Sequence, residues 1–157
     1  MKRKAHILIV DDVAENIQVA MNILKEDGYD FTFATGGMEA LALLESEVER
    51  YDLILLDIMM PGLDGYTVCK ILSENAKTSD IPVIFLTAKV GIEALSKGFS
   101  TGAVDYISKP FHSEELLARV KVHVQLYQAK QLLKTHNLSL ETKVEYEKER
   151  LLTELEG

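Results

Sequence analysis

Short apolar runs alternate along this chain with longer stretches of helical periodicity. The runs are rich in Ile, Leu, Val and Phe and end at polar or turn residues, as expected for strands that are buried on both faces. Between the runs, apolar residues recur every three or four positions, as they do on the buried stripe of a helix. The predicted strands are Ile7–Val10, Phe31–Ala34, Leu53–Leu56, Pro82–Leu86 and Val104–Ile107.

The same pattern predicts a helix after each strand. The last helix should begin near Ser113 and continue to Gly157, because no Pro or Gly intervenes to stop it. Strands that alternate with helices in this way predict an α/β fold, in which helices cover both faces of a five-stranded parallel sheet. The other predicted helices are Ala14–Glu26, Met38–Glu47, a helix capped by Asp64 that ends near Ser73, and a weaker one over Ile92–Gly98.

The last predicted helix is too long to belong wholly to a globular domain. Its roughly forty residues would span about 60 Å at 1.5 Å per residue, and only its first turns can cover a sheet. Leu126, Leu133 and Leu140 fit the d positions of a heptad frame, and Asn137 fits an a position. We therefore expect a globular domain over 4–125 and a projecting coiled coil over 126–157, most simply as a parallel homodimer. A solvated or disordered tail is the alternative.

Composition narrows the classes of function. The net charge of −8 argues against direct nucleic-acid binding, since phosphate contacts need a basic face. The single cysteine, Cys69, cannot form an internal disulfide, and we expect it to be a small buried hydrophobe. The first apolar run stops at Asp11, which makes it too short for a signal peptide or a membrane span. A cytoplasmic protein without membrane contact follows.

Charged side chains stand where several predicted strands end. Asp11 and Asp12 follow the first strand, Asp57 follows the third, and Lys109 follows the fifth. Because the carboxyl ends of parallel strands share one edge of a sheet, these groups should meet in one crevice. Carboxylate oxygens are hard ligands that suit Mg²⁺ or Mn²⁺. One carboxylate could then attack phosphorus and form an acyl phosphate, while the metal and the ammonium neutralise the phosphoryl oxygens.

Thr87 and Ala88 belong to the same predicted edge. The hydroxyl of Thr87 can donate to a phosphoryl oxygen, and Ala88 is small enough to leave the approach open. Each residue alone has an ordinary structural reading: Asp11 and Asp12 could cap the first helix, and Lys109 could be a surface lysine. Their occurrence together at successive strand ends favours a site.

Four segments carry a resemblance to a known family. They are Ile7–Asp12, Leu55–Gly65, Leu86–Ala88 and Gly102–Phe111. They resemble the receiver domain of two-component response regulators, over about residues 4–125. The resemblance implies a flavodoxin-like strand order, 2-1-3-4-5. It also implies a signalling switch in which a histidine kinase or a phosphotransfer protein is the partner that donates the phosphoryl group.

The resemblance implies a role for each matching residue. Asp57 would be the phosphoacceptor and would also bind the metal, together with Asp12, the backbone carbonyl of Met59 and, as an assisting ligand, Asp11. The phosphoryl group would be bound by Thr87, Ala88 and Lys109. Thr87 and Tyr106 would form the switch pair, and the peptide bond before Pro110 is often cis in the family.

Some features remain open in the sequence. The protein is not expected to be an enzyme, because an aspartyl phosphatase would need a second acid where Met59 stands. Met59 and Lys89 would overhang the phosphoryl group, or would be ordinary loop residues. The histidines share no ligand spacing, and we expect them at the surface. The tail resembles coiled linkers that join receivers to kinase, cyclase or phosphodiesterase domains, so a receiver truncated in its linker is the alternative to a stand-alone regulator.

Overall fold

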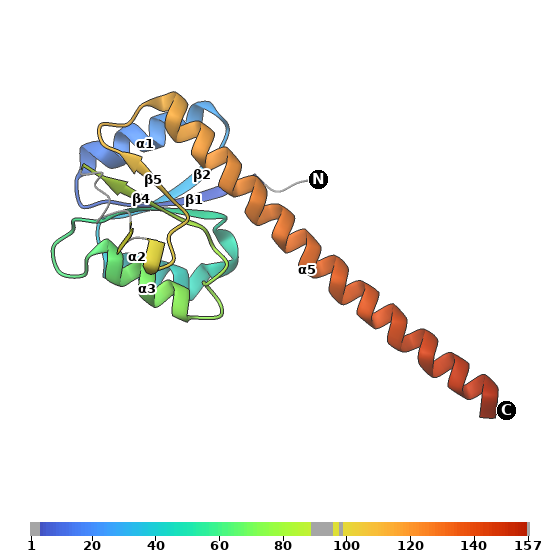
Figure 1. Ribbon diagram of the computed structural model, residues 1–157. Coiled ribbons are helices and arrows are strands. Elements are labelled where there is room, and N and C mark those ends of the chain that lie inside the picture. Colours follow the sequence, from blue (N-terminus) through green and yellow to red (C-terminus); the bar gives the residue numbers. More distant parts are fainter. Residues whose placement is uncertain (1–3, 89–95, 98, 157) are drawn as a thin grey trace. The chain divides into compact units, whose positions relative to one another are not determined.

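The predicted α/β fold is confirmed by the computed structural model, which describes residues 4–88, 96–97 and 99–156. The strands form one parallel sheet in the order β2-β1-β3-β4-β5 (Figure 1). This is the order that the resemblance implied. The strands are β1 (His6–Val10), β2 (Asp30–Ala34), β3 (Leu53–Asp57), β4 (Val83–Thr87) and β5 (Asp105–Ser108).

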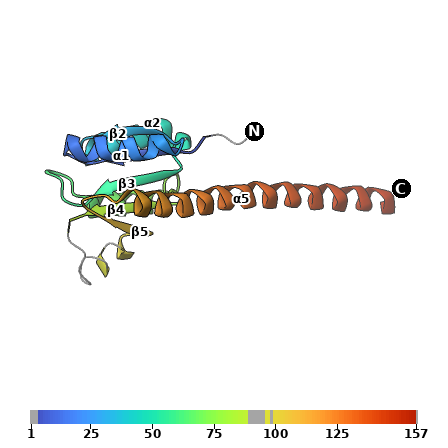
Figure 2. The ribbon, with the colours of Figure 1, turned by 90° about the horizontal axis from the view of Figure 1, so that it is seen from above.

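Strands β3, β4 and β5 extend to the polar residue that follows each apolar run, whereas β1 and β2 end at the apolar residues Val10 and Ala34. Asp57 pairs with Leu86, and Thr87 pairs with Ser108, so polar residues still take part in the ladder at the carboxyl edge. The neighbouring strands β3, β4 and β5 follow one another in Figure 2. This pairing fixes the positions of the candidate residues at the carboxyl edge of the sheet.

Helices cover both faces of the sheet and create two cores. They are α1 (Ala14–Glu26), α2 (Gly37–Glu47), α3 (Gly65–Glu74) and α5 (Ser113–Glu156), with a 3-10 turn at Val48–Arg50. Alternate residues of a strand point to opposite faces. Leu8 and Val10 therefore pack toward α2 and α3, whereas Ile7 and Ile9 pack toward α1 and the start of α5 (Figure 1).

The predicted helix over Ile92–Gly98 lies mostly outside the described residues. Residues 96–97 and 99–100 are helical, and residues 89–95 and 98 are not described. Lys89, which we expected to overhang the phosphoryl group, falls in that part. Cys69 is buried, as expected, and its Sγ donates to the carbonyl oxygen of Thr101 over 3.4 Å.

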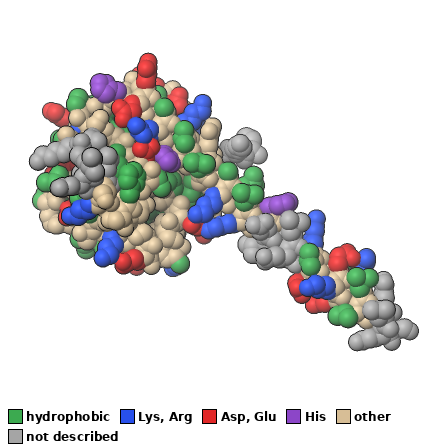
Figure 3. Space-filling model, viewed as in Figure 1, with side chains coloured by type: hydrophobic (Ala, Val, Ile, Leu, Met, Phe, Trp, Pro, Cys, Tyr) green, Lys and Arg blue, Asp and Glu red, His purple; other side chains and the backbone are tan. Residues whose placement is uncertain are grey.

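The chain divides into two units, Met1–Tyr127 and Gln128–Gly157. Helix α5 continues without interruption into the second unit, as its lack of Pro and Gly predicted. Within that unit, Leu133, Val144 and Leu151 are exposed, and charged side chains of both signs lie among hydrophobic ones (Figure 3). The coiled coil stays a prediction, because the side chains of Asn137 and Leu140 lie outside the described part of the chain. None of the helices described is both apolar and long enough to cross a membrane.

Candidate functional site

Asp57 stands at the carboxyl end of the central strand. The ladder holds its backbone in place, since Asp57 pairs with Leu86 and the next N–H, of Ile58, donates to the carbonyl oxygen of Leu86 over 3.3 Å. Its side chain is almost fully buried. Asp57 Oδ1 lies 3.0 Å from Lys109 Nζ. The structure therefore holds a charged carboxylate against a cation at the sheet edge.

Asp11 and Asp12 lie beside Asp57. Asp11 is fully buried; its Oδ1 accepts a hydrogen bond from the N–H of Val13 over 2.9 Å, and its Oδ2 lies 3.0 Å from Lys109 Nζ. The bond to Val13 supports the start of α1, so Asp11 serves that turn and faces the site as well. Asp12 is exposed. Asp11, Asp12 and Asp57 each offer one carboxylate oxygen, and these three oxygens lie within 4.8 Å of one another.

This donor set suits a hard divalent cation. All three candidate ligands are carboxylates, two of which are buried, and magnesium prefers such oxygens and keeps several waters. Burial and the neighbouring acids Asp11 and Asp12 raise the pKa of Asp57 to about 6, although Lys109 acts in the opposite direction. Burial would lower the pKa of Lys109, but Asp11 and Asp57 outweigh it and raise that pKa. A cation beside the acids would relieve their repulsion.

Lys109 and Thr87 are brought to the same edge by the β4–β5 ladder. The N–H of Lys109 donates to the carbonyl oxygen of Thr87 over 2.9 Å, and the peptide bond between Lys109 and Pro110 is cis. Thr87 is buried at the end of β4, whereas Ala88 beyond it is exposed. The ladder thus brings Thr87 to the sheet edge at which the ammonium of Lys109 contacts Asp11 and Asp57.

The loop from β3 to α3 is drawn tightly against Asp57. The N–H of Gly65 donates to the carbonyl oxygen of Ile58 over 2.9 Å, and a Cβ at Gly65 would lie 2.3 Å from the carbonyl oxygen of Asp57. The side chain of Asp64 accepts from the N–H of Thr67, as the predicted N-cap should. Met59 lies in this loop with its side chain 80% exposed. Its carbonyl as a metal ligand stays a prediction.

Tyr106 is already buried in this structure. Its ring lies 5.6 Å from that of Phe85 and 5.4 Å from that of Phe99, measured between centroids. The family resemblance implied that Thr87 and Tyr106 form a switch pair, which would need the ring to turn inward when Thr87 moves. Here the inward position is occupied at the outset, held by aromatic contacts that favour tilted and edge-to-face geometry.

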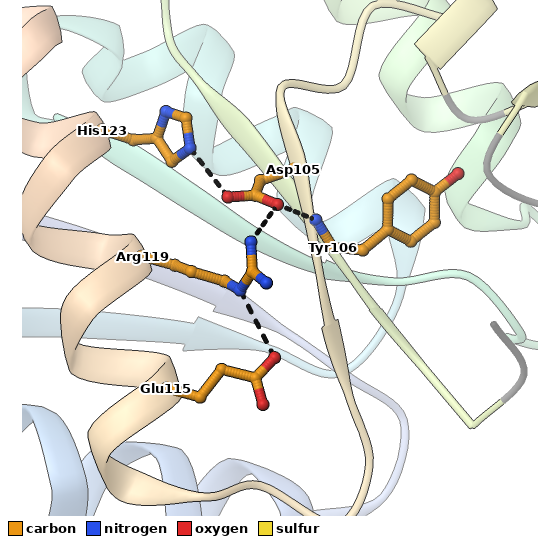
Figure 4. Close-up of polar contacts among 5 residues, drawn as sticks. All are labelled: Asp105, Tyr106, Glu115, Arg119 and His123. Carbon is orange, nitrogen blue, oxygen red and sulfur yellow. Dashed lines mark hydrogen bonds and ion pairs between the residues drawn. The ribbon is translucent and has the colours of Figure 1, made fainter.

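A second polar cluster was missed in the sequence. Asp105, at the start of β5, accepts hydrogen bonds from its neighbour's backbone N–H and from Arg119 and His123 of α5 (Figure 4). Burial would raise the pKa of Asp105, but the bonds from Arg119, the Tyr106 N–H and His123 lower it below its ordinary value. The available signal was the four-residue spacing of Glu115, Arg119 and His123, which puts them on one stripe of a helix.

The expectation that histidines lie at the surface was wrong for two of them. His6 is buried at the start of β1, where its Nε2 lies 2.7 Å from Thr32 Oγ1, and His123 is largely buried against Asp105. His112 and His136 are exposed. The ring of a histidine can pack against apolar side chains, and its nitrogens can form hydrogen bonds. A nearby carboxylate or hydroxyl therefore satisfies these nitrogens and allows the side chain to be buried.

Comparison with known proteins identifies the family. The profile of the response regulator receiver domain matches residues 7–121, which is most of the chain. The chain belongs to the response regulator receiver family. A receiver domain of a Francisella response regulator has the same fold, with 36% identity and a TM-score of 0.71 over 78% of this chain and 98% of that one.

Curated receiver-containing relatives are longer proteins. The "DNA-binding dual master transcriptional regulator RpaA" of Synechocystis is 44% identical over 115 residues, which is 73% of this chain and 46% of that protein. "Response regulator PleD" of Caulobacter vibrioides is 39% identical over 117 residues, or 74% of this chain and 25% of that protein. The chain therefore spans half or less of the length of these relatives.

Proposed function

We propose that this receiver is a phosphorylation switch in which Asp57 accepts a phosphoryl group in a Mg²⁺-dependent step. The observation that carries the proposal is the position of Lys109 Nζ, 3.0 Å from both Asp57 Oδ1 and Asp11 Oδ2, beside three clustered carboxylates. Such a cation beside an acidic metal cluster is what a transferring phosphoryl group requires, because its charge is spread over several oxygens.

The geometry supports the following covalent step. An oxygen of the Asp57 carboxylate attacks the phosphorus of a phosphohistidine, a P–O bond forms, the P–N bond breaks, and the imidazole leaves with a proton from solvent. Lys109 and the Thr87 hydroxyl bind the phosphoryl oxygens at the edge of the sheet. A bound Mg²⁺, held by Asp11, Asp12 and Asp57, would neutralise the acids and the incoming phosphoryl group together.

The switching step would stabilise one packing of β4 and β5. A phosphoryl group on Asp57 draws the Thr87 hydroxyl toward it. Because Tyr106 is already buried between Phe85 and Phe99, we propose that phosphorylation holds this inward ring in place rather than moving it there from solvent. Phosphorylation would then shift the population between two packings, one in which the ring is held firmly and one in which it is held loosely.

The donor partner in this proposal is a sensor histidine kinase or a phosphotransfer protein. Such kinases take their phosphoryl group from ATP, so we place the reaction in the cytoplasm. The second partner is another copy of this chain. The exposed Leu133, Val144 and Leu151 on α5 would be covered in a parallel homodimer, and an exposed helix of this length gains stability from such pairing.

A second candidate concerns the whole protein. The chain covers only 25% of PleD and 46% of RpaA. This supports the alternative that the receiver controls a further output domain, which is joined to it through the helix after residue 125. That domain would be a histidine kinase, a cyclase or a phosphodiesterase. The receiver chemistry proposed above is the same in both cases, and the chain itself is proposed not to be an enzyme.

Incorporation of radiolabelled phosphate from a small phosphodonor, such as phosphoramidate, tests the proposal. The wild type should be labelled only when Mg²⁺ or Mn²⁺ is present, and Asp57→Asn should not be labelled at all. Asp27→Asn, an exposed acid that ends α1, is the matched control and should keep full labelling. Full labelling of Asp57→Asn would show that the wrong acceptor has been chosen.

A further inference from the structure

The carboxylate of Asp105 joins the strand that carries Tyr106 to helix α5. Its Oδ1 accepts from the N–H of Tyr106 over 2.8 Å and from Arg119 Nη1 over 2.6 Å, and its Oδ2 lies 3.0 Å from His123 Nε2. Since an ionised carboxylate only accepts, His123 is the donor in that contact. We call Asp105, Arg119 and His123 the β5–α5 clamp.

The clamp constrains the helix in a way that apolar packing does not. Leu116, Val120 and Val124 bury the underside of α5, but the hydrophobic effect has no direction and tolerates small sliding or rotation of a helix. Hydrogen bonds do have direction. Arg119 and His123 are one helical turn apart, so two bonds from one carboxylate fix both the height and the rotation of this part of α5.

The clamp is also connected to the candidate phosphorylation site. Strand β5 has only four residues, and Lys109, which contacts Asp57, follows it directly. Figure 4 shows the ring of Tyr106 on the side of the strand away from Arg119 and His123. The strand therefore presents the switch ring on one face and the clamp on the other, so a displacement of its backbone at Tyr106 must either carry α5 along or break the clamp.

We propose that Arg119 and His123 are positioning residues that transmit the state of Asp57 from β5 to helix α5. This inference rests on the proposed function and names the route by which the switch reaches the helix that continues into the second unit. The clamp needs no rearrangement to act, because its three members are already in contact. Glu115, which lies 3.3 Å from Arg119 within the same helix, orients Arg119 but makes no link to the strand.

Amide chemical shifts with and without Mg²⁺ and beryllofluoride, a phosphoryl mimic, test the inference. In the wild type, the amides of Thr87 and Tyr106 and those of Val120 and Val124 should all respond. In the double variant Arg119→Gln, His123→Gln, the response at Thr87 should be kept, while the responses at Val120 and Val124 should fall roughly twofold or more. A merely structural role would not separate the two groups of amides.

Controls keep the outcomes distinct. Glu115→Gln leaves both links to β5 in place and should retain the full response of α5. His123→Gln alone, which can still donate from its amide, should give an intermediate response and serves if the double variant does not fold. Full responses of Val120 and Val124 in the folded double variant would overturn the clamp alone. No response at Thr87 in the wild type would overturn the proposed function and the clamp with it.

Discussion

Replacing Lys109 by Met tests the electrostatics of the site. At pH 8 the variant would keep Asp57 ionised in a buried crevice beside Asp11, without the cation that both carboxylates contact. One contact at 3.0 Å has a gross Coulomb energy of about 5 kcal/mol at an effective dielectric constant near 20, and much of this is offset by the cost of desolvating the ammonium. Breaking a buried pair from one side costs about 3–5 kcal/mol, so we expect a loss of about 3 kcal/mol in the free energy of unfolding.

The loss should depend on pH in a defined direction. The folded-state pKa of Asp57, about 6, lies above its unfolded value, and removal of Lys109 takes away an interaction that lowers it. The folded variant therefore takes up a proton at Asp57 as pH falls, and the repulsion is relieved. At pH 5 the deficit relative to wild type should shrink to about 1 kcal/mol.

Urea unfolding followed by circular dichroism at pH 8 and pH 5 measures this deficit. Lys70→Met, at an exposed position on α3, is the control and should change the unfolding free energy by less than about 0.5 kcal/mol at both pH values. If Lys109→Met were equally destabilised at pH 5 and pH 8, its lost packing rather than its charge would be responsible, and the reasoning would be refuted.

Three further predictions concern the metal, the acceptor and the loop. Millimolar Mg²⁺ should raise the melting temperature of the wild type, and Asp12→Asn, at an exposed ligand position, should lose this gain without loss of fold; an unchanged gain would exclude Asp12 as a ligand. The affinity for Mg²⁺ should weaken as pH falls through about 6, because a proton on Asp57 competes with the metal. Calorimetry at pH 5 and pH 8 measures this affinity, and equal affinities at the two pH values would show that Asp57 is not a ligand. Gly65→Ala should lower the free energy of unfolding by about 1–3 kcal/mol in urea unfolding, because its methyl group would collide with the backbone at the end of β3. Gly36→Ala is the control and should not destabilise the fold, because a methyl group there meets nothing within 4 Å. Equal effects of the two substitutions would contradict the packing described for Gly65.

The strands and the site edge could be predicted because both depend on local sequence. Buried parallel strands are continuous apolar runs, and in a parallel sheet their carboxyl ends share an edge. Asp11, Asp57 and Lys109 therefore came together as expected. The strand ends differed by a residue or so, since the ladder accepts polar residues such as Asp57 and Thr87 at its edge.

The β5–α5 clamp could not be predicted in the same way. Asp105 and His123 are 18 residues apart, and their contact depends on how α5 lies on the sheet. A charged residue next to a strand has many possible partners, and the residue type of a histidine does not decide whether it is buried. The buried position of Tyr106 likewise depends on Phe85 and Phe99, which come from different elements and reveal their contact only in the folded chain.

Locating the phosphoryl group on the chain tests the central claim most directly. The protein is treated with phosphoramidate and Mg²⁺, and the acyl phosphate is then reduced with borohydride, which converts the modified aspartate to homoserine. Tandem mass spectrometry of the peptides should find homoserine at position 57 and aspartate at positions 11 and 12. Homoserine at position 11 or 12, or at none of the three, would contradict the account.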